Sequence, residues 1–202
     1  MQRTKLNLIL ASASPRRKEL LGWSYLPFKI VVSDIEENSS CEDPKDIVMD
    51  LASQKAEAVI SGCTRDDFVI GSDTIVVFNG EILEKPKDKS DAKTMLQKLS
   101  GESHTVFTGV SFKHQNRTLN FYDKTEVSFD EIDDELLSYY LATGESMDKA
   151  GSYGIQGAAL GFIANVSGSY SNVVGFPINK VIKELQAFLK TDYKGLHEIF
   201  NS

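Results

Sequence analysis

Two arginines follow directly on a serine-rich turn and a proline in "ASASPRRKELL". Ser14 suits a helix N-cap and Pro15 suits the first helical position. Arg16 and Arg17 then fall in the first turn, where the helix dipole disfavours each cation by about 0.3–1 kcal/mol. A bound phosphate would reverse that penalty, because free N–H groups and guanidinium groups together bind anions. The alternative is that one or both arginines pair with surface carboxylates such as Glu19.

A single carboxylate interrupts the apolar segment "VIGSDTIVV". This residue is Asp73, and Thr74 beside it adds a hydroxyl. An ionised carboxylate on a buried strand is costly unless it is paired or bound to a metal. We therefore interpret Asp73 as a functional residue at a strand end, the alternative being a solvated aspartate at a bulge or strand end.

Two further charged stretches have the chemistry of a phosphate or metal site. In "LEKPKD" the proline keeps Lys85 in an extended backbone, from which its ammonium could reach a phosphate. In the acidic loop "SDIEENSS", Glu36 and Glu37 could bind a hard cation. Both stretches also fit ordinary solvated surface groups.

The glycine-rich stretch "DKAGSYGIQG" is the last candidate. Glycines allow the backbone to approach a ligand closely, and Gln156 offers both a donor and an acceptor to a base edge. An irregular loop is the alternative. Together, the candidates suit metal-assisted chemistry on a polyphosphate nucleotide.

The elements that must position these residues follow from periodicity and turn signals. The sequence predicts strands over Lys5–Leu10, Phe28–Val32, "FVIGSDTIVVF" with an Asn79-Gly80 hairpin into "EILEKP", and a second hairpin from "HTVFTGVSFK" to "TLNFYDKTEVSF". It predicts helices over Pro15–Leu21, about Pro44–Ser61, from a Ser90 cap to Leu99, from an Asp130 cap to about Leu141, and over Ile178–Leu189. We expect a loosely held tail, and we expect Gly71 and Gly109 at turns or strand irregularities.

Composition limits the fold and the partners. The 202 residues are 41% hydrophobic and 25% charged, and this length fits one large α/β domain or two small lobes. Early alternation of strands with helices and the hairpins in the middle indicate α/β or α+β with a mixed sheet, and we expect one domain, 1–202. Any second lobe must be an insertion at about residues 85–145. The net charge of −7 argues against coating nucleic acid or anionic membrane.

Cellular location follows from the cysteines and the N-terminus. Cys41 and Cys63 form no CxxC pair and suit free thiols in a reducing compartment, although a single disulfide stays open. The segment "LNLILA" followed by "ASA" imitates a signal peptide, but it is short and is interrupted by Asn7. We favour a buried first strand and a cytoplasmic protein.

Eight ordered segments resemble one known family. They are "LASASPRRKELL", "SDIEE", "LASQKA", "GSDTIVV", "GEILEKPKD", "ML..LSG..H.V.TGV", "DKAGSYGIQG" and "GSYSNVVGFP", and they span about residues 8–185. The chain is thus similar to the Maf family of nucleoside triphosphate pyrophosphatases. The resemblance implies two lobes around a central cleft, as in ITPase-like folds, and usually a homodimer. It also implies hydrolysis of a nucleoside triphosphate to the monophosphate and pyrophosphate with Mg²⁺ or Mn²⁺.

The resemblance also implies roles for individual residues. Asp73 would activate water and bind metal together with Glu37. The phosphates would be held by Ser12, Arg16, Arg17 and Lys55, with Lys85 nearby. Base preference falls on Arg16, Thr74 and Gln156, which look like the branch acting on dTTP and UTP.

Two alternatives stay open. One is a pyrophosphatase for a nucleotide with another base, such as 7-methyl-GTP, and the other is a non-catalytic nucleotide-binding regulator of septation.

Departures from the family pattern are slight: Ser72 replaces the commoner alanine, and Phe176 replaces leucine.

Overall fold

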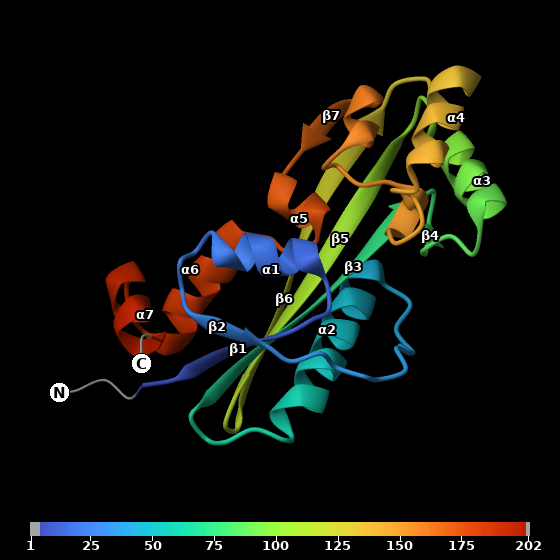
Figure 1. Ribbon diagram of the computed structural model, residues 1–202. Coiled ribbons are helices and arrows are strands. Elements are labelled where there is room, and N and C mark those ends of the chain that lie inside the picture. Colours follow the sequence, from blue (N-terminus) through green and yellow to red (C-terminus); the bar gives the residue numbers. More distant parts are fainter. Residues whose placement is uncertain (1–4, 201–202) are drawn as a thin grey trace. The chain divides into compact units, whose positions relative to one another are not determined.

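Seven strands form one mixed sheet in a computed structural model that describes residues 5–200 (Figure 1). The order is β2-β1-β3-β5-β6-β7, with β4 paired to β3. The strands are β1 (Asn7–Ala11), β2 (Phe28–Ile30), β3 (Asp67–Phe78), β4 (Glu81–Leu83), β5 (Ser103–His114), β6 (Arg117–Phe129) and β7 (Ile163–Ser167). β1 runs parallel to β2 and β3, whereas β4 is antiparallel to β3 and β7 to β6. The prediction of a mixed α/β sheet is confirmed.

Helices flank this sheet. They are α1 (Pro15–Gly22), α2 (Pro44–Ile60), α3 (Lys89–Leu99), α4 (Asp134–Thr143), α5 (Tyr170–Val174), α6 (Ile178–Leu189) and α7 (Tyr193–Phe200), with 3₁₀ turns η1 (Ala150–Ser152) and η2 (Ala158–Gly161). None of the helices between residues 5 and 200 has the length and apolarity needed to cross a membrane.

The chain divides into two compact units. The first contains the described residues up to Asp73, together with Thr108–Asp123 and those from Gly175 onward. The second contains Thr74–Phe107 and Lys124–Val174. The expectation of a second lobe inserted at about residues 85–145 stays a prediction.

In the first unit, α2 lies directly against the sheet. A Cβ atom at Gly71 of β3 would meet the Ala52 carbonyl oxygen at 2.2 Å, and one at Gly109 of β5 would meet that of Val48 at 2.1 Å. The expectation that these glycines mark turns or irregularities is therefore wrong: they lie inside strands, where only a missing side chain lets the helix approach.

A cluster of aromatic side chains forms another part of this unit's core. Phe68 of β3 is fully buried, with ring centroids 5.4 Å from Phe188 of α6 and 5.9 Å from Phe200 of α7. The tail is thus a helix with buried side chains, and the expectation of a loosely held tail is wrong. β1 confirms the strand interpretation of the N-terminal segment, and Cys41 and Cys63 are free thiols.

The second unit has its own core. Its buried residues come from β3, β4, β5, β6, α3, α4 and the glycine-rich stretch, and include Val76, Leu96, Val127, Tyr140 and Phe162.

Local signals predicted most element ends, with two corrections. Ser14 caps α1 by accepting from the backbone N–H of Arg17, and Asn79 and Gly80 take the positive φ values (49° and 82°) of a type I′ turn. However, α3 is capped by Asp88 and not by Ser90, and α4 by Asp133 and not by Asp130. In both cases, several residues able to cap stand within three positions of each other.

Candidate active site

Lys55 is the centre of a charged cluster in the first unit. Its Nζ lies 2.6 Å from Oδ1 of Asp73 and 2.7 Å from Oε2 of Glu37. The side chains of Lys55 and Asp73 are each 10% exposed, whereas that of Glu37 is 47% exposed. Asp73 is therefore a buried, paired carboxylate, and the alternative of a solvated aspartate is wrong.

The folding of α2 and β3 explains this pairing. Gly71 brings α2 close to β3, and Asp73 lies two residues further along the same face of the strand. Lys55 projects from α2 within the stretch that contacts Gly71, so a buried ammonium meets a buried carboxylate. Such a pair persists only because each charge compensates the other.

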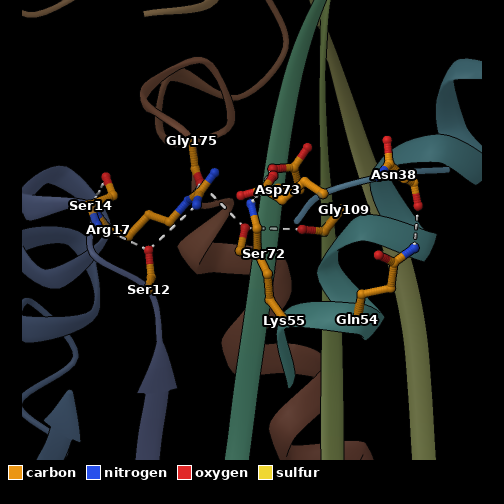
Figure 2. A network of polar contacts seen from close by, with 11 residues as sticks. Ser12, Ser14, Arg17, Asn38, Gln54, Lys55, Ser72, Asp73, Gly109 and Gly175 are labelled. Carbon is orange, nitrogen blue, oxygen red and sulfur yellow. Dashed lines mark hydrogen bonds and ion pairs between the residues drawn. The ribbon is translucent and has the colours of Figure 1, made fainter. Parts of the chain in front are cut away.

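Arg17 lies at the start of α1, held by two oxygen atoms (Figure 2). Its Nε donates to the Gly175 carbonyl at 2.9 Å, and an Nη donates to Ser12 Oγ at 3.4 Å. Burial lowers the pKa of Arg17, whereas the charges of Asp73 and Glu37 raise it. The guanidinium thus feels both carboxylates of the Lys55 cluster.

Ser72 connects the strand to the same carbonyl. Its fully buried hydroxyl contacts the carbonyl oxygens of Gly109 at 3.0 Å and Gly175 at 3.4 Å (Figure 2). An alanine at this position would leave these carbonyls without that donor. Ser72 therefore belongs to the support of Arg17, a role the sequence did not indicate.

The structure places the remaining predicted residues as follows. Arg16 is half-buried on α1, and its charge lowers the pKa of Arg17. Three others belong to the second unit: Thr74 and Gln156 are half-buried, and Lys85 is exposed. The described contacts therefore join Arg17 with Ser12, and Lys55 with Glu37 and Asp73, all within the first unit.

The cluster fits a metal that takes few protein ligands. Nowhere among residues 5–200 do three or more His, Cys, Asp or Glu side chains gather in a way that could hold a metal ion. Glu37 and Asp73 nevertheless contact the same nitrogen, so that two carboxylates from different elements converge on one ammonium. Mg²⁺ commonly uses one or two carboxylates and completes its shell with water and substrate phosphates.

Other contributors to the site escaped prediction because they act through backbone atoms or through a loop. The Gly175 carbonyl, which accepts from Arg17, is one of them. The only sequence feature that marks this position is a glycine before Phe176-Pro177. Gln54 is another: it precedes Lys55 and donates to the Asn38 carbonyl beside Glu37 at 2.7 Å.

A family model and several known proteins match most of this chain. A family model described as Maf-like protein matches residues 7–188. The chain is 50% identical over 181 residues to a dTTP/UTP pyrophosphatase of Bacillus cytotoxicus, covering 89% of this chain and 94% of that protein. It is 49% identical over 182 residues to a dTTP/UTP pyrophosphatase of Bacillus anthracis and 50% identical over 182 to one of Bacillus cereus strain B4264. These alignments cover 90% of this chain and 95% of each relative.

Proposed function

The chain belongs to the Maf family, and from that premise we propose that it hydrolyses dTTP and UTP to the monophosphate and pyrophosphate. The observation that carries the proposal is the cluster of Lys55, Asp73 and Glu37, whose carboxylates act electrostatically on Arg17. It combines a candidate base, a candidate metal ligand and cations for phosphates. The identity of about half the residues with dTTP/UTP pyrophosphatases supports the choice of substrate.

In the proposed mechanism, Asp73 orients the attacking water and accepts its proton. Arg16, Arg17 and Lys55 hold the phosphates and neutralise the charge that grows on the pyrophosphate leaving group. Ser12 supports Arg17 through its hydroxyl. Cations already held in place, such as Arg17 and Lys55, suit this task because they need no rearrangement as the charge develops.

A divalent cation, Mg²⁺ or Mn²⁺, would be held by Glu37 and Asp73. When bound, it supplies Lewis-acid polarisation of a phosphoryl oxygen. Without the metal, the ammonium of Lys55 compensates the negative charges of the two carboxylates.

The roles of the second-unit residues are part of the proposal. Lys85 would contact a phosphate, whereas Thr74 and Gln156 would set the preference for a pyrimidine. Groups built to hydrogen-bond one base leave unpaired donors and acceptors with another, which penalises the wrong nucleotide. We also propose a cytoplasmic homodimer, because the substrates are made there and family members usually pair.

The test is a panel of nucleoside triphosphates assayed for pyrophosphate with and without Mg²⁺. We expect dTTP and UTP to give equal amounts of monophosphate and pyrophosphate, at least about tenfold faster than purine nucleotides. Faster turnover of 7-methyl-GTP would move the chain to another substrate branch. Tight binding without any pyrophosphate would instead favour the regulatory alternative.

A further inference from the structure

We propose that Gln54 is a positioning residue that holds the Glu37 loop on α2 and so places the Glu37 carboxylate for metal binding. The inference rests on the proposed function for its catalytic consequence. The contacts that motivate it lie entirely within the first unit and concern the loop between β2 and α2.

The loop needs an anchor because it has no regular structure. Residues 31–42 contain no helix or strand, and most of them are exposed. Glu37 nevertheless reaches Lys55 Nζ at 2.7 Å from this loop, with a side chain that is 47% exposed. Because the Glu37 end of this ion pair is open to solvent, the pair by itself restrains the loop only weakly. Other contacts must therefore restrict the backbone around Glu37.

Gln54 provides such a contact beside Glu37. Its Nε2 donates to the carbonyl oxygen of Asn38 at 2.7 Å and to Oδ2 of Asp50 at 3.0 Å. That Asp50 oxygen also accepts from the hydroxyl of Ser39 at 2.7 Å. Asp50 and Gln54 are four residues apart on one face of α2, so together they hold two successive loop residues.

The anchor affects Glu37 because of the order of residues along α2 and along the loop. Gln54 directly precedes Lys55, and Asn38 directly follows Glu37. One helical segment therefore binds the loop backbone, through the bond from Gln54 to the Asn38 carbonyl (Figure 2). The same segment presents the Lys55 ammonium that the Glu37 carboxylate contacts. Loss of the Gln54 amide would remove the hydrogen bond to the loop backbone, so that Glu37 would be held less firmly beside Lys55 and Asp73.

The substitution Gln54→Leu tests this role, because leucine keeps the bulk and removes both donors. In the metal-free protein, we expect faster amide hydrogen exchange for residues 36–40. In the enzyme, we expect the Mg²⁺ concentration for half-maximal activity to rise on the order of tenfold, with kcat recovering at saturating Mg²⁺. Gln97→Leu, the same change at an exposed position of α3, is the matched control.

A double-mutant cycle separates positioning from a general structural effect. If Gln54 acts through Glu37, Gln54→Leu should add no further Mg²⁺ effect in a Glu37→Gln background. Unchanged exchange, or a Mg²⁺ constant equal to that of Gln97→Leu, would overturn the inference. An unmodified protein that releases no pyrophosphate would instead defeat the proposed function, while the exchange measurement would still test the anchor.

Discussion

At the scale of the residue, the single side chain of Lys55 pairs with both carboxylates of the candidate site. It compensates the buried charge of Asp73 and also holds Glu37 of the exposed loop. Removing one partner of a buried ion pair is costly because the other charge stays unpaired. Substitutions in this cluster therefore need readouts that separate chemistry from stability.

Asp73→Asn tests the proposed base, at a residue that would also hold the metal. The amide keeps the shape of the side chain but accepts no proton, so kcat should fall about 10²–10⁴-fold. Binding of a non-hydrolysable dTTP analogue, measured by calorimetry, should stay within a few-fold of normal. Asp67→Asn, on the same strand but paired with Asn7 and Thr64, is the control and should leave kcat nearly unchanged. Near-normal turnover of Asp73→Asn would remove this residue from the mechanism.

His104 makes stability depend on pH. Its ring is 2% exposed, its Nε2 lies 2.7 Å from the Tyr153 hydroxyl, and burial lowers its pKa to about 4. The unfolded chain, with a histidine pKa near 6.5, then binds the proton more readily than the folded chain. The free energy of unfolding should therefore fall as the pH drops from about 6.5 to 4, by up to about 3 kcal/mol.

Urea unfolding at pH 7.5 and pH 5 measures this effect. His104→Gln should lose most of this histidine-dependent part of the pH slope, whereas His197→Gln on α7 should keep it. An unchanged slope in His104→Gln would show that other groups cause the acid sensitivity.

At the scale of elements, the contact between α2 and the sheet determines the site. Gly71→Ala would place a methyl group 2.2 Å from the Ala52 carbonyl and push away the helix that carries Lys55. We expect a loss of about 3 kcal/mol or more in the free energy of unfolding, together with reduced turnover. Gly22→Ala, where nothing lies within 4 Å of the added carbon, is the control for chemical denaturation.

Elements with local signals were predictable, and those that depend on distant contacts were not. Ser14 and Pro15 mark the start of α1, and Asn79-Gly80 marks a hairpin, because these residues favour their own backbone conformations. The helical tail has Gly195 in its interior and is stabilised by contacts such as that of Phe200 with Phe68. Such contacts have no local signature.

The same distinction holds within the candidate site. Charge and spacing indicated Arg17 and Asp73 from the residues alone, whereas Lys55 entered only through the family resemblance. The partner of Arg17, the Gly175 carbonyl, lies 158 positions away in the chain. Any residue can supply a carbonyl, so only the folded arrangement identifies this one.

At the scale of the whole molecule, the described helix α7 lies beyond the residues that match the family model, 7–188, yet it completes the core of the first unit. Phe200 is 3% exposed and contacts Phe68, and Leu6 donates to the Ile199 carbonyl at 2.9 Å. The tail thus supports β1 and β3 at once.

Phe200→Ala should therefore lower stability without touching the chemistry. We expect a loss of about 3–5 kcal/mol, or roughly 10 °C in Tm, in thermal unfolding followed by circular dichroism. Turnover at 25 °C should remain close to normal, and Lys194→Ala at an exposed position should change neither quantity. A Tm equal to that of Lys194→Ala would show that α7 contributes nothing to the core.

The unequal exposure of the two carboxylates around Lys55 gives the cluster a graded response to ionic strength. Mobile ions screen charges in contact with water, with a Debye length of about 10 Å at 0.1 M, but scarcely reach a buried pair. Added potassium chloride should therefore loosen Glu37, at 47% exposure, well before Asp73, at 10%. Concentrated salt would free the Glu37 carboxylate, while Gln54 and Asp50 still hold the loop backbone and the ammonium stays paired with Asp73 on the strand.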